Sequence, residues 1–588
     1  MRKHRLLAAA FAIVAALGAG GASAQDWNPF DPFANSSSRE RQEPKPEPAP
    51  QSGYGDDIVR PLGDSSSTAV ERGDLAPVMA PDGSGLPYEL WRGLDAGKLE
   101  QLIAEIEIPP RSPALHKLWL RLITSDVTAP EGGVTDQQFL ALRMELLYRS
   151  GLLGEAARLL GSQPAAEPTV AVLAARNEIG LGDKAGGCAT AKAAGAAPAT
   201  LPKPVKADAA LISGYCAAIA GDAPGAGLAA EMAREEGVKE GAGLAALDAL
   251  SMGVKPQVSP EARLTLLDYR IIEAAGGTVE PAHLRSRAAP ALLAALAVDP
   301  NAQTAERIAA AEAAAAVNAL TPEQLADIYR SQASAHATLS DADGSDTPQR
   351  RAALFVAAEH EGTPQKKVRL IRAFLDEAHH AGFYMTALRM VAPASEAVVA
   401  APEIGWYAET GIEVALTAGN YAKARQWTAF GSSPGGAAGS LDHWLALIDI
   451  AEGSANGSEA DLHQVEALAV AGRMDATLLH RLATVLDALD YDVPIPLWEA
   501  ASRTPQPAGG YLPETGVLTE LQDAAKQHQF GRTVLLAMQT LGPNGAEGAN
   551  MIALGDAIRA LRRAGLEQDA HSLGFEALFA TWPRAITN

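Results

Sequence analysis

One stretch of sequence, residues 142–160 (LRMELLYRSGLLGEAARLL), constrains the fold of this chain most strongly. Apolar residues recur every three or four positions on either side of Gly151, as on the buried faces of two amphipathic helices. Gly151 permits the left-handed conformation that ends the first helix, and the small side chain of Ala156 lets the two helices approach closely. The stretch therefore predicts a helix hairpin, with Leu147 and Leu160 among its apolar positions.

The same pattern, a glycine followed five residues later by an alanine, returns in three other segments. The pairs are Gly221 with Ala226, Gly419 with Ala424, and Gly565 with Ala570. A single hairpin cannot bury its own apolar face, so such units stack on their neighbours. No segment shows sustained alternation of β-branched residues, and alanine, the strongest helix former, supplies much of the 47% hydrophobic content. We therefore expect an all-α fold, a right-handed solenoid of stacked helix hairpins.

These hairpins resemble the repeats of the tetratricopeptide-like α-solenoid superfamily. Four positions match the family's first-helix apolar residue, turn, small residue and second-helix apolar residue: Leu147, Gly151, Ala156 and Leu160. The turn glycines at 151, 182 and 221 lie 31 and 39 residues apart, which brackets the ~34-residue repeat. The tryptophan and glycine of the family's first helix are missing, and the closing proline is irregular. The resemblance implies a binding scaffold without specifying its ligand.

The first 24 residues read as a secretory signal peptide. A basic stretch at residues 2–5 precedes an apolar run at 6–17, and an A-x-A site places cleavage between Ala24 and Gln25. The apolar run is shorter than the ~20 residues of a membrane span, so we expect no transmembrane anchor after cleavage. We therefore expect a periplasmic or secreted protein.

Charge and cysteine content narrow the range of partners and the compartment. The formal net charge of −22 argues against nucleic acid as a partner. The sequence contains two cysteines, Cys188 and Cys216. An even pair in an oxidising compartment predicts a disulfide bond, and the alternative is a pair of buried thiols that pack as small apolar side chains.

Composition divides the chain into five regions. After the signal peptide (1–24), a linker rich in proline, serine and acidic residues (25–86) has too few apolar residues to support ordered packing, so we expect it to be disordered. Helical patterns then fill an N-terminal region (87–339), a middle region (340–509) and a C-terminal region (510–588). Helices expected in these regions include 260–275, 305–320 and 403–417.

Motifs for catalysis or metal binding occur only in incomplete form. Residues 431–435 match G-x-S-x-G, but a helix precedes the serine where a nucleophile elbow needs a strand. Residues 93–99 lack the Ser or Thr of a phosphate-binding loop, and the neighbours His379 and His380 point in different directions on a helix. The acidic loop at 341–346 lacks EF-hand spacing, which leaves a calcium clip as the alternative to a solvated loop. We expect no catalytic residue, no cofactor and no metal site.

The chain also resembles the superhelical domain of soluble lytic transglycosylases. Those enzymes carry a catalytic Glu in a separate lysozyme-like domain, whose Glu-Ser and Gly-Leu-Met-Gln runs are absent from this sequence. An envelope enzyme that acts on peptidoglycan or polysaccharide is therefore an alternative hypothesis, and a solute- or calcium-binding module is another.

Five aromatic residues lie within a span of 40 residues: Trp406, Tyr407, Tyr421, Trp427 and Trp444. Aromatic side chains are enriched at binding hot spots, so these residues are candidates for partner binding. Their helical spacing fits a core equally well, and we favour the core. Our leading hypothesis is a non-catalytic periplasmic scaffold or adaptor, which binds an envelope protein or a peptide in the groove of its helical repeats.

Overall fold

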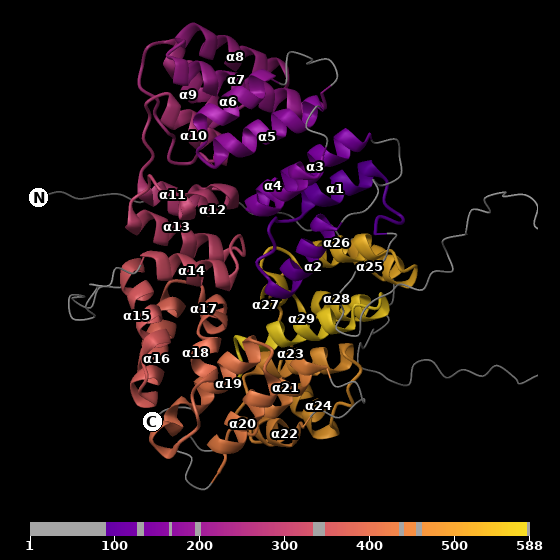
Figure 1. Cartoon of the computed structure of the whole chain (residues 1–588). Helices are drawn as coiled ribbons and strands as arrows, with labels where there is room; N and C mark the ends of the chain where they lie inside the picture. The colour runs from indigo at the N-terminus through magenta and orange to yellow at the C-terminus, as the bar shows by residue number, and fades with distance from the viewer. Residues whose placement is uncertain are drawn as a thin grey trace, which may run out of the picture. The chain divides into compact units, whose positions relative to one another are not determined.

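The computed structural model describes residues 90–125, 135–163, 167–193, 201–332, 347–433, 440–453 and 461–584. These residues form 29 α-helices and no β-strand, which confirms the all-α prediction (Figure 1). The predicted signal peptide with its cleavage site, the 25–86 linker and the acidic loop at 341–346 lie outside the described residues. No helix in the described ranges is both long enough and apolar enough to cross a membrane.

The helices follow one another with short connections. Those that precede residue 333 are α1 (Ala96–Glu105), α2 (Pro113–Thr124), α3 (Asp136–Arg149), α4 (Leu153–Gly161), α5 (Pro168–Gly180), α6 (Lys184–Ala193), α7 (Lys203–Ala220), α8 (Ala223–Glu235), α9 (Ala242–Ser251), α10 (Leu266–Ala274), α11 (Pro281–Arg287), α12 (Pro290–Val298), α13 (Thr304–Ala316) and α14 (Pro322–Gln332). Those that follow residue 346 are α15 (Pro348–His360), α16 (Pro364–His380), α17 (Tyr384–Met390), α18 (Ala392–Glu396), the 3-10 helix η3 (Pro402–Tyr407), α19 (Ala408–Thr417), α20 (Tyr421–Gly431), α21 (Trp444–Glu452), α22 (His463–Val470), α23 (Ala476–Ala488), α24 (Ile495–Ser502), α25 (Thr515–Lys526), α26 (Phe530–Leu541), α27 (Gly545–Gly548), α28 (Met551–Arg563) and α29 (Glu567–Phe579).

Proline and capping side chains mark many of the helix starts. Thr135 and Thr265 form reciprocal capping boxes with Gln138 and Asp268, which satisfies backbone donors that the first turn leaves open. Proline lies at the start of α2, α5, α7, α8, α11, α12, α15, α16 and α24, where its missing N–H is not needed. Local sequence therefore sets where most of these helices begin.

The four turn glycines singled out in the sequence have left-handed backbone conformations. Their φ angles are +75° for Gly151, +72° for Gly221, +73° for Gly419 and +84° for Gly565. The four alanines that follow five residues later are fully buried: Ala156, Ala226, Ala424 and Ala570. At each turn, the N–H after the glycine donates to a carbonyl five residues earlier, as in a Schellman motif.

Three more hairpins have the same turn. The turn residues with positive φ are Gly182, Gly382 and His528, and buried small residues follow five positions later at Gly187, Ala387 and Thr533. A Cβ atom at residue 187 would lie 2.5 Å from the Ile179 side chain, so this position admits only glycine. In the last two cases the next such turn, at Gly419 or Gly565, comes 37 residues later.

Three expected helices are shorter than their sequence patterns. The expected helix at 403–417 is divided into η3 and α19, because Ile404 has φ −119° and ψ 18°, outside the helical region. The expected helix at 260–275 begins only at Leu266, because Leu264 exchanges backbone hydrogen bonds with the segment before α12. The helix expected to reach residue 320 ends at Ala316, ahead of Asn318 with its positive φ of 58°.

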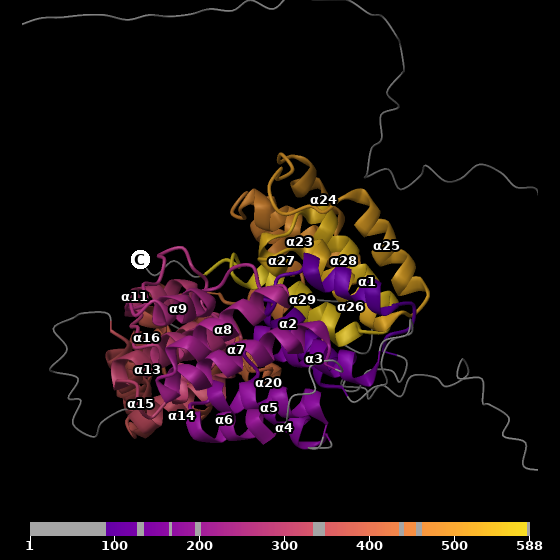
Figure 2. The same cartoon turned by 90° about the horizontal axis from the view of Figure 1, so that it is seen from above.

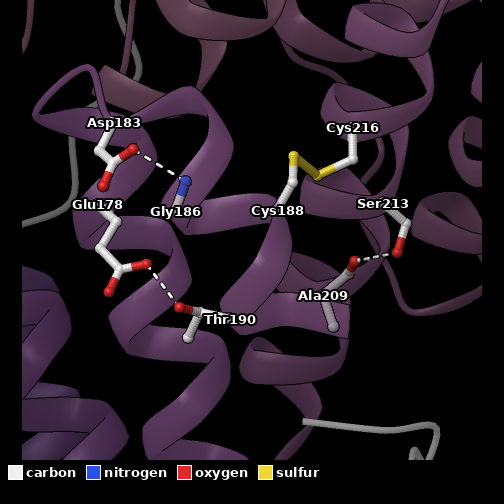
Figure 3. Close-up of a disulfide and its surroundings, with 8 residues drawn as sticks. All are labelled: Glu178, Asp183, Gly186, Cys188, Thr190, Ala209, Ser213 and Cys216. Atoms are coloured by element: carbon white, nitrogen blue, oxygen red, sulfur yellow. Dashed lines mark hydrogen bonds between the residues drawn. A yellow bond between two sulfur atoms is a disulfide. The ribbon is translucent and has the colours of Figure 1, made fainter. Parts of the chain in front are cut away.

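The disulfide between Cys188 and Cys216 is confirmed, with a Cα–Cα distance of 5.8 Å. Figure 3 shows that it joins α6 to α7, near a hydrogen bond of 2.8 Å from the Thr190 hydroxyl to Glu178. Helix α6 contains two adjacent glycines and buries only Gly187. The disulfide therefore secures a helix that has little apolar anchorage of its own.

The first described helices pack against the last ones. The Arg121 guanidinium on α2 forms an ion pair of 2.5 Å with Asp569 on α29, and the Gly531 N–H donates to the carbonyl of Leu90 at 3.0 Å. In Figures 1 and 2, the indigo helices α1 and α2 lie beside the yellow helices α26 and α29. All the described residues belong to one compact unit that extends from Leu75 to Asn588, and the predicted boundaries near 340 and 510 remain predictions.

A buried carboxyl group lies at this junction. Glu576 on α29 accepts a hydrogen bond of 3.0 Å from the backbone N–H of Ala114, in the first turn of α2. Burial raises the pKa of the Glu576 carboxyl from 4.5 to about 7. The folded state therefore holds this proton more tightly than the unfolded chain does. The contribution to stability is complete below pH 4.5 and is lost as the pH rises through 7, a loss of about 3 kcal/mol.

The variant Glu576→Gln should remove this pH dependence, because glutamine keeps an acceptor oxygen for the Ala114 N–H and carries no charge. We expect the free energy of unfolding of the variant, relative to the wild type, to rise by about 3 kcal/mol between pH 4.5 and pH 8. Urea titrations of both proteins across this range measure the difference. Burial also lowers the pKa of His116 on α2 to about 4, but this contribution cancels in the comparison. A difference that does not change with pH would contradict the prediction.

Candidate functional site

A cleft of about 430 Å³ lies among α10, α11, α12 and α13, with the start of α15 at one side (Figure 1). Its size is in the range of small-molecule and peptide side-chain sites. The lining residues are Tyr269, Glu273, Pro281, Leu284, Arg285, Leu293, Leu296, Asp299, Asn301, Ala302, Gln303, Ala305, Glu306, Ala309, Ala310, Pro348 and Gln349. This is the largest hollow found in the described part of the chain, and it is our candidate site.

Helix α11 forms one wall of the cleft because local sequence holds it out from the core. It is a short helix between two prolines, Pro281 and Pro290, and none of its residues is buried. The backbone at either end of Ala288 bonds to Leu264, with Arg287 O accepting at 3.1 Å and Ala289 N donating at 2.8 Å. Helix α11 is thereby fixed beside α13 without filling the space between them.

The floor of the cleft is apolar. Helix α12 is apolar on all sides, and its residues 291–297 are buried, so it runs through the interior beneath the cleft. Leu293 and Leu296 on α12 and Leu284 on α11 contribute leucine side chains to the lining, and alanines of α13 complete it. Removal of apolar surface from water by a ligand side chain would be favourable here.

A buried arginine stabilises the wall between α10 and α12. Arg270, whose side chain is 4% exposed, pairs with Glu273 at 2.8 Å and with Asp299 at 2.9 Å, and its Nε donates to the carbonyl of Gly180 at 3.1 Å. Burial acts to raise the pKa of Asp299, but hydrogen bonds from Asn301 and Arg270 outweigh it and hold that pKa below its usual value. Arg270 therefore serves the structure of the wall, and its charge is neutralised.

Four polar side chains at the rim are free for a ligand. Arg285, Gln303, Glu306 and Gln349 are exposed, and none of them makes a side-chain hydrogen bond or ion pair with the described residues. Arg285 lies in the last turn of α11 and Glu306 in the first turn of α13, so each charge is favoured by the dipole of its helix. The cleft thus combines an apolar floor with an unpaired cation, an unpaired anion and two amides.

The residue types of the cleft suit binding better than catalysis. Among the described residues that line it there is no serine, cysteine, histidine or lysine, so the usual nucleophiles and histidine bases are missing. Burial, and then the Glu273 carboxylate, raise the pKa of Tyr269 to about 12, so this hydroxyl stays protonated. No group of three or more His, Cys, Asp or Glu residues placed to hold a metal ion occurs in the described ranges.

The aromatic residues that the sequence brought forward lie elsewhere and are mostly in the core. Tyr407, Trp427 and Trp444 are fully buried, and the Tyr407 and Trp427 rings pack edge to face. Tyr421 is half-buried and donates to the carbonyl of Ala451 at 3.0 Å. Trp406 is 39% exposed and can meet a partner without a change in fold. None of the five lines the cleft.

The incomplete motifs of the sequence gather no site either. His379 and His380 have ring centroids 6.2 Å apart, and the His379 ring packs against Tyr384. The G-x-S-x-G match begins at the end of α20, and its last two residues lie outside the described ranges. The glycine-rich stretch at 93–99 leads into α1, whose first turn is capped by the Asp95 side chain.

Sequence reasoning missed the cleft, although two local signals mark it. Residues 281–287 (PAHLRSR) form a basic helical segment without apolar periodicity, and residues 290–298 (PALLAALAV) follow as an entirely apolar one. A surface helix directly next to a fully buried helix is a way to leave a hollow between layers. The carboxylates of the lining come from three different helices, and no spacing rule brings those together.

No protein-family model, curated protein or solved structure matches this chain.

Proposed function

We propose that this chain is a non-catalytic binding protein of an extracytoplasmic compartment, which holds part of a partner polypeptide in the cleft between α11 and α13. The observation that carries the proposal is the free polar rim over an apolar floor. Polar side chains that bond to nothing in the protein, placed around a hollow of this size, are the usual composition of a binding site. The signal-peptide pattern and the disulfide support the compartment, because disulfides persist where conditions are oxidising.

The hairpins support a scaffold role. We propose that they belong to a right-handed, tetratricopeptide-like solenoid. Seven turns with positive φ followed by a buried small residue, and the 37-residue interval between some of them, support a repeated unit. Successive first helices α5, α7 and α9 contact one another, as stacked repeats require. The envelope protein or peptide that we expect as the partner would then meet a surface built from several hairpins.

The proposal is tested by affinity capture with a variant that fills the cleft. The full chain carrying a tag is recovered from the cross-linked envelope fraction of producing cells, and retained proteins are quantified by mass spectrometry. Leu284→Arg places a long charged side chain in the cleft from a helix without buried residues, so the fold should survive. We expect a reproducible partner polypeptide whose recovery falls at least about tenfold with this variant, as for loss of a central apolar contact.

Leu228→Arg is the matched control, because Leu228 is an exposed leucine (64%) on α8 and does not line the cleft. The control should retain the partner at the wild-type level. Equal recovery with both variants would contradict the proposal. If no polypeptide is retained above background, the binding role loses its main support, and incubation with peptidoglycan fragments then tests the enzymatic alternative.

A further inference from the structure

We infer that the cleft recognises an extended polypeptide segment in which an apolar residue is followed by a basic one. This inference rests on the proposed function and names the chemistry of its ligand. It combines three properties of the cleft: the apolar floor, the excess of carboxylates that face the ligand, and the free amides of the rim.

The floor limits the ligand to something that brings apolar surface. Leu284, Leu293 and Leu296 offer a patch of leucine side chains inside a volume of about 430 Å³. This volume admits a few side chains with their backbone, and it is too small for a folded domain. A fully hydrated ligand, such as a polyanion, would lose water at the floor without compensation. One apolar side chain of a polypeptide fits the floor.

The charge distribution favours a cation beside that apolar side chain. Three carboxylates line the cleft, from Glu273, Asp299 and Glu306, against one cation, Arg285. The second nearby cation, Arg270, is buried behind the wall and is already paired with Glu273 and Asp299. A ligand therefore meets the unpaired Glu306 and the partly exposed Glu273. A lysine or arginine side chain complements these carboxylates.

The rim amides fit the backbone of an extended segment. Each primary amide has an acceptor oxygen and a donor NH₂, which match the N–H and C=O of a peptide group. Gln303 and Gln349 present such amides on different helices, and Arg285 adds a donor for a backbone carbonyl. A saccharide would need an aromatic platform, but the one aromatic ring of the described lining, Tyr269, is covered on one face by the Arg270 guanidinium at 5.5 Å. A polypeptide is therefore the occupant that the lining favours.

Fluorescence anisotropy with three labelled eight-residue peptides tests the inference on the full chain. The peptides share a Gly/Ser framework and carry Leu-Lys, Leu-Glu or Ser-Lys at the centre. We expect Leu-Lys to bind about tenfold tighter than Ser-Lys, because the leucine side chain is buried, and about fivefold tighter than Leu-Glu. The charge preference should shrink in 1 M salt, where the Debye length is about 3 Å.

Charge reversal at the rim gives the decisive comparison. Glu306→Lys should invert the preference, so that Leu-Glu binds tighter than Leu-Lys, and Glu306→Gln should abolish it. Asp136→Lys is the matched control, because Asp136 is also an exposed carboxylate in the first turn of a helix and does not line the cleft. It should keep the wild-type preference. Circular dichroism melts confirm that each variant is folded.

The outcomes separate the inference from the proposed function. If Leu-Lys and Leu-Glu bind equally, or if Glu306→Lys leaves the preference unchanged, the inference is overturned while the binding role stands on the capture experiment. If Ser-Lys binds as tightly as Leu-Lys, the apolar floor is not used and the inference is also overturned. If no peptide binds the wild type at millimolar concentration and the capture experiment yields no partner, both fail.

Discussion

Replacing Arg351 with alanine is expected to lower the free energy of unfolding by about 3–5 kcal/mol, because it leaves a buried carboxylate without its counter-ion. Arg351 on α15 and Glu312 on α13 are only 5% and 6% exposed. The guanidinium bonds to both carboxylate oxygens, with Nε–Oε1 at 3.0 Å and Nη2–Oε2 at 2.6 Å. The Tyr329 hydroxyl donates to the same carboxylate at 2.7 Å. Burial and the carboxylate raise the pKa of Tyr329 well above its usual value, so the hydroxyl remains a donor.

Calorimetric melts and urea titrations measure this effect. The double variant Glu312→Leu with Arg351→Met removes both charges and should lose less stability than Arg351→Ala alone, because no unpaired charge remains. Arg330→Ala is the matched control. Arg330 on α14 also pairs with carboxylates, but its side chain is 45% exposed, and we expect a loss of at most about 1 kcal/mol. A loss for Arg351→Ala no larger than that of the control would show that the buried pair is not stabilising.

The second large effect concerns the disulfide between α6 and α7. Replacing Cys188 and Cys216 together with serine is expected to lower the free energy of unfolding by roughly 3–4 kcal/mol, because the unfolded chain regains the entropy that the closed loop of 28 residues removes. Chemical unfolding of the variant and of the reduced wild type should give the same loss. Reduction should not weaken the variant further.

The loss should also have a local signature. Helix α6 buries one residue, whereas α8 buries Ala226, Ala229, Ala230 and Ala233. Amide hydrogen exchange in α6 should therefore accelerate in the variant more than exchange in α8, because local opening follows the number of buried apolar contacts. Uniform acceleration along the chain would indicate that the disulfide stabilises only the whole unit. Unchanged stability would contradict the entropic argument.

The parts of the fold that could be predicted from the sequence are those set by short stretches of chain. The turn at Gly151 depends on residues within one hairpin, namely a glycine that tolerates positive φ and a small residue five positions later. The same holds for the pairing of Cys188 with Cys216, since two neighbouring helices bring them together. Such features need no knowledge of distant packing, and the sequence therefore contained enough information to predict them.

The cleft and the placement of the aromatic residues depend on packing between distant elements. The periodicity of Trp427 and Trp444 is the same whether that helical face meets solvent or another helix, so pattern alone left the choice between core and surface open. Glu306 and Glu273 face one hollow because α10 and α13 are held apart by α11. Glu312 was a readable signal, since a carboxylate inside an alanine-rich run calls for a buried partner, but the sequence did not identify Arg351 as that partner.

The contact between the first and last described helices determines when the protein can finish folding. Arg121 lies 448 residues before its partner Asp569, and a ribosome needs roughly 20–90 s to synthesise that length at 5–20 residues per second. Throughout this time the apolar face of α2, with Leu118 and Trp119, lacks the helices that cover it in the finished protein. The beginning of the chain is thus made early and docks last. A chain with this topology depends on whatever protects its leading helices from aggregation until its own end arrives.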